Sequence, residues 1–192
     1  MGVATHSGWA AVVVLGEARK DPTVLARSRI PLIEAGFPES KQPYHAVESL
    51  GIEEAAQRLD RYVAQAEGMA HRALGQLNQD LGRQGYGLSS IGVLESAGRK
   101  GASLNSILAS HALIHAADGD HFRNAVAAAA ERMGLSVYRI PARDLESRAQ
   151  ARLRQPLSHL RSVVGDMRAQ IGPPWGADQK NAALLAWLLL AL

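Results

Sequence analysis

The stretch VATHSGWAAVVVLG, residues 3–16, is the first strand-like segment of the sequence. Its valine-rich run is typical of a strand that is buried on both faces. Thr23–Ile33 predicts a second strand, which pairs with the first across a turn at residues 20–22. Residues 36–49 are interrupted by Pro and Gly and predict a loop that could hold one short strand. The chain is therefore expected to begin with a hairpin of two long strands.

Helices and single strands alternate through the remaining sequence. A long helix is predicted over Ile52–Leu81, because apolar residues recur on one helical face until Gly82–Gly87 interrupts the pattern. Strands are predicted over Ser89–Glu95 and Leu135–Ile140. Three further helical segments are Leu104–Met133 with an interruption near Asp118 and Gly119, Arg143–Ile171 with a break at Pro156, and Trp175–Leu190. This alternation indicates an α/β protein.

Composition narrows the class of protein. The 192 residues are 47% hydrophobic and 20% charged, which predicts one globular domain over residues 1–192. The chain has no cysteine, so disulfides and thiolate metal sites are excluded, and a cytoplasmic location is expected. The terminal apolar run, Ala182–Leu192, is too short for a bilayer, which requires roughly 20 residues. We expect a buried helix there that could also pack against a second subunit as a homodimer, and no membrane association.

The order of elements, together with four stretches, resembles a known family. The stretches VATHSGWAAVVVLG, SSIGVLES, GLSVYRIP and ADQKNAALLAW resemble those of the ribonuclease H-like superfamily, in particular the RuvC-type Holliday junction resolvases. The resemblance implies a mixed sheet flanked by helices. It also implies metal-dependent cleavage of nucleic-acid phosphodiesters, with Mg²⁺ or Mn²⁺ as the cofactor and nucleic acid as the partner.

The family's acidic residues can be placed on this sequence position by position. The family carries an aspartate on the first strand, a glutamate on a later core strand, and two acidic residues at the start of the last helix. Here these positions hold His6, Glu95, Asp178 and Asn181. The resemblance thus implies His6, Glu95 and Asp178 as catalytic residues, with Glu95 and Asp178 as metal ligands. Because two acidic positions are replaced, a non-catalytic module that binds nucleic acid or protein is the alternative.

A second group of polar residues occurs in SILASHALIHAADGDHFRNAV, residues 106–126. His111 and His115 are four residues apart, so on a helix they share one face, and Asp118 follows closely. Two histidines at this spacing with a carboxylate could hold Zn²⁺, and they indicate a metal hydrolase of small phosphate esters as a further alternative. The structural alternative is hydrogen-bonded histidines at a helix break that Asp118 or Asp120 caps.

Cations that could hold a phosphate occur in three places. Ser96, Arg99 and Lys100 follow Glu95 in a glycine-containing junction between a strand and a helix, and could contact a substrate phosphate unless the junction is a plain surface turn. Lys180, close to Asp178, is a further predicted substrate-binding residue. Residues 132–168 contain eight arginines and three acidic residues in a chain of net charge +3. This segment predicts phosphate contacts, or else a solvated helical face.

Overall fold

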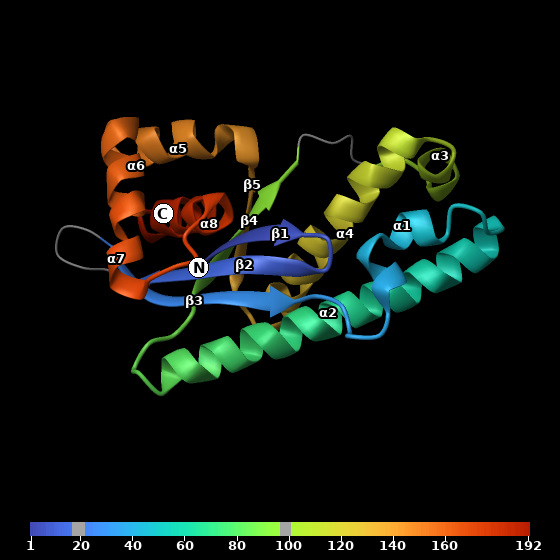
Figure 1. Cartoon of the computed structure of the whole chain (residues 1–192), viewed down its shortest axis with the longest axis horizontal. Helices are drawn as coiled ribbons and strands as arrows, with labels where there is room; N and C mark the ends of the chain where they lie inside the picture. The colour runs from blue at the N-terminus through green and yellow to red at the C-terminus, as the bar shows by residue number, and fades with distance from the viewer. Residues whose placement is uncertain (17–21, 97–100) are drawn as a thin grey trace.

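A five-stranded mixed sheet runs through the centre of the molecule (Figure 1). The structure is a computed structural model, and it describes residues 1–16, 22–96 and 101–192. The strands are β1 (Gly2–His6), β2 (Trp9–Gly16), β3 (Thr23–Pro31), β4 (Ser90–Glu95) and β5 (Ser136–Pro141), in the spatial order β3-β2-β1-β4-β5. Strand β2 is antiparallel to both neighbours, whereas β1, β4 and β5 are parallel. The predicted mixed sheet is confirmed.

Helices cover both faces of the sheet, so each face has its own apolar core. One face, with Val3, Val12 and Val93, packs against α2 (Ile52–Gly82) and α4 (His111–Arg132). The other, with Val13 and Leu94, packs against α5 (Leu145–Leu153), α6 (Leu157–Asp166) and α8 (Ala177–Leu190). The short helices are η1 (Pro38–Lys41), α1 (Pro43–Ala46), α3 (Leu104–Leu108), η2 (Ala142–Asp144) and α7 (Arg168–Ile171). Burial on both faces explains why the central strands are apolar throughout.

The predicted first strand, residues 3–16, is in fact two strands. It divides at Ser7 and Gly8, and His6 pairs with Trp9 across the resulting hairpin. Gly8 has a φ of +83°, a left-handed conformation that glycine adopts at little cost. Because the strands on both sides of Ser7 and Gly8 are apolar, the pattern of apolar residues did not indicate a turn there. The turn predicted at residues 20–22 lies largely outside the described residues.

The predicted loop contains short helices, and one predicted helix break was wrong. Residues 36–49 form η1 and α1 rather than a strand. The helical segment that begins at Leu104 breaks at Ala109 and Ser110, between α3 and α4, and not near Asp118 and Gly119. Asp118 lies buried within the continuous α4, where its polar partners come from α1 instead of from a helix end.

Paired glycines bring α8 close to the sheet. Gly2 and Gly92 are opposite each other on β1 and β4. A Cβ added at Gly2 would lie 2.0 Å from the carbonyl oxygen of Ala182, and one added at Gly92 would lie 2.6 Å from the side chain of Leu185. The missing side chain at Gly2 permits this approach, which holds the middle of α8 against the start of β1.

The apolar residues of α8 are buried against the sheet and helices of the same chain. Seven of its residues are buried: Ala182, Ala183, Leu184, Leu185, Ala186, Leu188 and Leu189. A helix that is apolar on all sides is expected to be buried. The prediction that this helix forms a homodimer surface therefore finds no support in the structure. Within the described ranges, no helix has both the length and the apolarity needed to cross a membrane.

Candidate functional site

A contact between an imidazole and a carboxylate joins the end of β1 to the first turn of α8. Asp178 Oδ1 lies 2.9 Å from Nε2 of His6, and about two fifths of each side chain is exposed (42% for His6 and 36% for Asp178). Solvent screens such a pair, so its contribution to stability is at most about 1 kcal/mol. Gln179 Oε1 accepts a hydrogen bond from the N–H of Gly176 at 2.9 Å, which satisfies one donor at the start of α8. Asp178 contacts His6 and also stands in the first turn of α8, where the helix dipole favours a negative charge.

His6 continues into a row of side chains across three strands. Its ring stacks on Trp9, with centroids 4.3 Å apart and planes 8° apart. The Cζ atom of Arg29 lies 4.1 Å from the centre of the Trp9 ring. Beside this row is a cavity of about 400 Å³, lined by Ser7, Gly8, Trp9, Arg29, Pro31 and Lys41. We call His6, Trp9, Arg29 and Lys41 the hairpin edge; it presents cations and an aromatic ring.

Glu95 lies on the other face of the sheet. Side chains alternate along β4, with Val93 in the core beneath α4 and Leu94 in the core beneath α8, so Glu95 belongs to the α4 side. There Arg139 Nη1 donates to Glu95 Oε1 at 3.3 Å and to Asn124 Oδ1 at 2.9 Å. These three residues line a cavity of about 340 Å³. Glu95 therefore belongs to the face that α4 covers, whereas Asp178 belongs to α8 on the opposite face.

The side chains at the end of β1 do not match the ligand set of a pair of Mg²⁺ ions. Mg²⁺ is held by carboxylate oxygens, whereas His6 offers an imidazole and Asn181 an amide at the two replaced positions. The carboxylate of Asp178 is paired with His6, and that of Glu95 with Arg139. Imidazole is a ligand that Mn²⁺ and Zn²⁺ accept more readily than Mg²⁺ does. A single softer cation suits this edge better than two magnesium ions.

The predicted phosphate-binding residues are separated in space. Ser96 is exposed and lies beside α4, where its Oγ accepts a hydrogen bond from Arg123 Nη1 at 3.3 Å. Arg99 and Lys100 lie outside the described residues. Lys180 is exposed on α8, two residues beyond Asp178. Two residues apart on a helix, Lys180 and Asp178 point to different sides, so within the described residues no contact places Lys180 at the end of β1.

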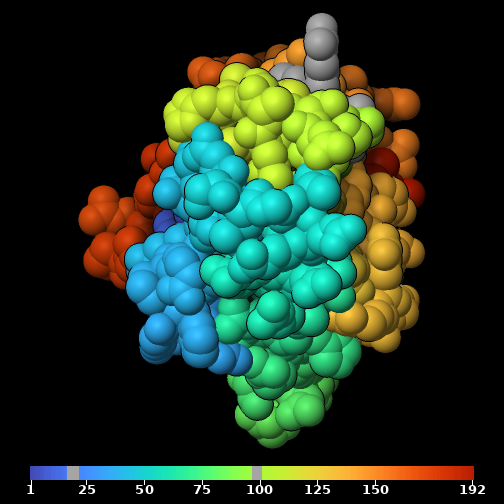
Figure 2. Space-filling model, turned by 90° about the vertical axis from the view of Figure 1, so that its right-hand side faces the viewer, coloured from blue at the N-terminus to red at the C-terminus, as the bar shows by residue number. Residues whose placement is uncertain are grey.

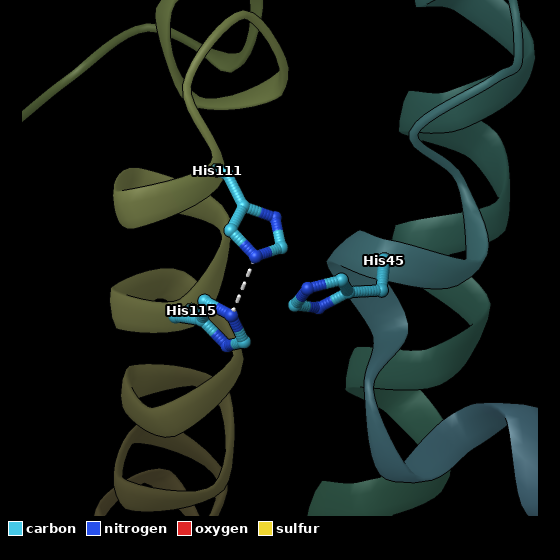
Figure 3. Close-up of side chains that lie close together, drawn as sticks. All are labelled: His45, His111 and His115. Atoms are coloured by element: carbon cyan, nitrogen blue, oxygen red, sulfur yellow. Dashed lines mark hydrogen bonds between the residues drawn. The ribbon is translucent and has the colours of Figure 1, made fainter.

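The histidines of α4 meet a third histidine that the sequence did not indicate. His111 and His115 occupy the first two turns of α4, with their Nε2 atoms 3.0 Å apart. The ring of His45, on α1, faces both of them, and one ligand nitrogen from each histidine lies within 4.8 Å of the others (Figure 3). We call these residues the three-histidine cluster.

Asp118 holds His45 in place instead of facing the cluster as a ligand. Its Oδ2 lies 2.5 Å from Nδ1 of His45, and its Oδ1 accepts the backbone N–H of Tyr44 at 2.7 Å. The residue is only 4% exposed, and this burial raises the pKa of its carboxyl group, against the opposing effect of the two hydrogen bonds. The helix break that Asp118 was expected to cap does not exist, because α4 is continuous.

His45 could not have been found by local spacing. It lies in the segment PYHA, far from His111 in the sequence, and no other histidine stands at a helical interval from it. Only the packing of α1 on α4 places it there. Figure 2 looks onto this end of the molecule, where the yellow-green segment of α3 and the start of α4 lies against the cyan segment that holds α1 and the start of α2.

Comparisons with known proteins rest on structure alone. No family model matches the chain, and no curated protein matches it in sequence. Among solved structures, Thermus thermophilus RuvC in complex with a Holliday junction substrate superimposes with a TM-score of 0.53 and 14% identity, covering 99% of this chain and 90% of that one. A second structure of Thermus thermophilus RuvC gives a TM-score of 0.50 and 12% identity, covering 99% and 92%.

The chain has the ribonuclease H-like fold of RuvC. At this level of identity the similarity concerns the fold, which the resemblance in the sequence had predicted. Activity has to be argued from the side chains, because one fold hosts many functions.

Proposed function

We propose that this chain is a nucleic-acid-binding protein of ribonuclease H-like fold whose two-metal centre is degenerate. The observation that carries the proposal is the contact between His6 and Asp178, 2.9 Å apart at the end of β1. It puts an imidazole where the resemblance implies an aspartate. The two-metal mechanism needs ions that activate water and stabilise the leaving oxygen. Without the carboxylates that neutralise those ions, the edge can hold a phosphodiester but lacks the means to cleave it with Mg²⁺.

The hairpin edge supplies the contacts for binding. Arg29 is held over the ring of Trp9, and Lys41 lines the same cavity. Because His6 and Arg29 already contact the ring, Trp9 orients the guanidinium group rather than stacking on a base. Such contacts reach phosphates, which position a nucleic acid but carry no sequence information. We therefore expect selection by nucleic-acid shape instead of by sequence. The similar structure of RuvC holds a Holliday junction substrate, which makes branched DNA the first ligand to test.

Fluorescence anisotropy with labelled DNA tests this function. A four-way junction and a linear duplex of the same arm sequence are titrated with the protein in Mg²⁺, and the same samples are run on denaturing gels. We expect saturable binding without cleavage. Asp178→Asn should bind at least as tightly as the wild type, because the change removes a negative charge beside the hairpin edge. Cleavage by the wild type in Mg²⁺ that Asp178→Asn abolishes would overturn the proposal, as would the absence of binding at low salt.

A metal-dependent phosphodiesterase is the second candidate function. It is favoured by one observation, an imidazole and a carboxylate in contact at the end of β1, which together could ligate one Mn²⁺ ion. This candidate predicts cleavage with Mn²⁺ but little with Mg²⁺. Restoring acidity by His6→Asp together with Asn181→Asp should then raise cleavage with Mg²⁺. If the wild type and the double variant cleave neither DNA nor RNA with any of these metals, this candidate fails.

A further inference from the structure

We propose that His45, His111 and His115 form a site for one Zn²⁺ ion, with Asp118 as the positioning carboxylate. The site goes beyond the proposed function, because it shares no residue with the hairpin edge. It is built from α1 and α4, and α4 covers the face of the sheet opposite α8. Because the two sites share no residue, variants can test the binding of nucleic acid and of metal separately.

The distances between the nitrogens suit a tetrahedral ion. With Zn–N bonds of about 2.0–2.1 Å, two ligand nitrogens of a tetrahedral site lie about 3.3 Å apart. The Nε2 atoms of His111 and His115 are 3.0 Å apart, and the ligand nitrogen of His45 completes a group within 4.8 Å. Small rotations of exposed side chains bring all three to bonding distance. The spacing of four residues on α4 supplies two ligands from one helical face.

Asp118 gives the site the supporting carboxylate that metal-bound histidines usually have. The Nδ1 atom of His45 lies 2.5 Å from Asp118 Oδ2. A proton on Nδ1 in this contact would leave Nε2 as the nitrogen for a metal. The N–H of Tyr44 fixes the other carboxylate oxygen, so the ring of His45 is held from behind. The hydrogen bond to Tyr44 explains Asp118 as an anchor for α1. It does not explain why two further imidazoles converge on the ring of His45 (Figure 3).

The ligand set selects the class of metal. Three neutral nitrogen donors suit Zn²⁺ and its transition-metal neighbours, whereas Mg²⁺ and Ca²⁺ require oxygen donors. Among the described residues the group contains three ligands, and the rings of His111 and His115 are exposed. Three protein ligands leave a fourth position for water or an added ligand, which is the pattern of reactive rather than purely structural zinc sites. An apolar group containing Val47, Leu59, Leu104 and Leu108 packs close by and supports α1.

Metal binding to the untagged, full-length chain tests the site. After treatment with a chelator, the protein is titrated with Zn²⁺ in competition with a chromophoric chelator, and with Co²⁺ while its visible absorption is recorded. We expect one ion per chain and the intense absorption of a four-coordinate Co²⁺ complex. His111→Ala and His115→Ala should each lower Zn²⁺ affinity by more than the roughly 10–100-fold expected for Asp118→Asn. Asp118→Asn should bind Co²⁺ more weakly while keeping the four-coordinate spectrum.

The matched control is His159→Ala, which removes an exposed histidine from α6 on the far face of the sheet. It should bind Zn²⁺ like the wild type. Circular dichroism of the metal-free variants separates loss of a ligand from loss of the fold. Zn²⁺ affinity that is the same in the wild type, His111→Ala and His115→Ala would overturn the proposal. So would binding that does not saturate at one ion, or a six-coordinate Co²⁺ spectrum.

Discussion

Asp178 and Asp118 each contact an imidazole, and the burial of each carboxylate decides whether the contact can be displaced. The pair between Asp178 and His6 is more than one third exposed on both sides, so water screens it and either partner can be displaced. Asp118 is almost completely buried and bonded to both His45 and the backbone of Tyr44. In this drier environment the hydrogen bond is stronger and its geometry is more tightly held. The first pair is suited to contact a ligand, and the second to orient a ring.

At the scale of one residue, His121 should make folding sensitive to acid. Burial lowers the pKa of His121 from its ordinary value of 6.5 to about 4. The unfolded chain therefore takes up this proton first, so stability is complete above about pH 6.5 and declines as the pH falls toward 4. The loss should reach about 3 kcal/mol at most, since each pKa unit is worth about 1.4 kcal/mol. Urea unfolding from pH 7 to pH 4.5 measures it, with His121→Gln as the comparison. A variant with the same pH dependence as the wild type would contradict the prediction.

At the scale of elements, the contact between α8 and the sheet depends on residues that have no side chain. Gly2 and Gly92 stand side by side, and the facing positions on α8 are alanine or leucine. Arg27 of β3 also holds the segment before α8, by donating to the carbonyl oxygens of Gly172 and Pro174 at 2.9 and 2.6 Å. The middle of α8 is thus held by close packing, and the segment that leads into its first turn is held by hydrogen bonds. This placement is what brings Asp178 to His6.

Gly2→Ala should destabilise the protein more than Gly92→Ala does. The added Cβ at Gly2 would lie 2.0 Å from a backbone oxygen, which cannot move without shifting α8, whereas at Gly92 it meets a side chain that can rotate. We expect a loss of about 3 kcal/mol for Gly2→Ala, the upper end of the usual overpacking range, and about 1 kcal/mol for Gly92→Ala. Gly75→Ala on α2 is the control, because nothing lies within 4 Å of its added Cβ. It should be neutral or stabilising by up to about 1 kcal/mol. Chemical denaturation ranks the three variants, and equal losses for Gly2 and Gly92 would refute the packing argument.

At the scale of the whole molecule, the arginine-rich segment is largely engaged within the chain. Five of its eight arginines form ion pairs: Arg132, Arg139, Arg143, Arg148 and Arg161. Arg152 donates to the carbonyl oxygens of the last two residues. Several of these pairs are exposed, so water screens them and a phosphate can displace them. The arginine-rich segment and the hairpin edge are therefore two separate candidate surfaces for nucleic acid.

The salt dependence of binding should distinguish these two surfaces. Log affinity falls as log salt concentration rises, and each phosphate contact that is lost makes this slope less steep by about 0.9 for duplex DNA. The double variant Arg29→Ala with Lys41→Ala should therefore have a slope that is less steep by nearly 2. Arg154→Ala with Arg168→Ala, which removes two exposed arginines of the arginine-rich segment, should leave it unchanged. Anisotropy titrations at several salt concentrations give both slopes. The reverse result would assign binding to the arginine-rich segment.

The sequence by itself determined the features that depend on neighbouring residues. Valine-rich runs and helical periodicity located the strands and the long helices, since burial imposes a period of about 2 or 3.6 on the chain. The spacing of His111 and His115 placed both rings on one face of a helix, and Asp178 was correctly expected in the first turn of the last helix. All of these follow from contacts made within one or two helical turns.

Only the tertiary structure decided which of these residues meet. The turn at Ser7 and Gly8 is hidden between two apolar strands, and it alone turns one predicted strand into a hairpin. The side of the sheet that Glu95 faces depends on the register of β4, where a shift of one residue exchanges the two faces. His45 reaches the other histidines because α1 packs on α4 through the buried carboxylate of Asp118. Such contacts join segments far apart in the chain, and local spacing carries no trace of them because packing between elements sets them.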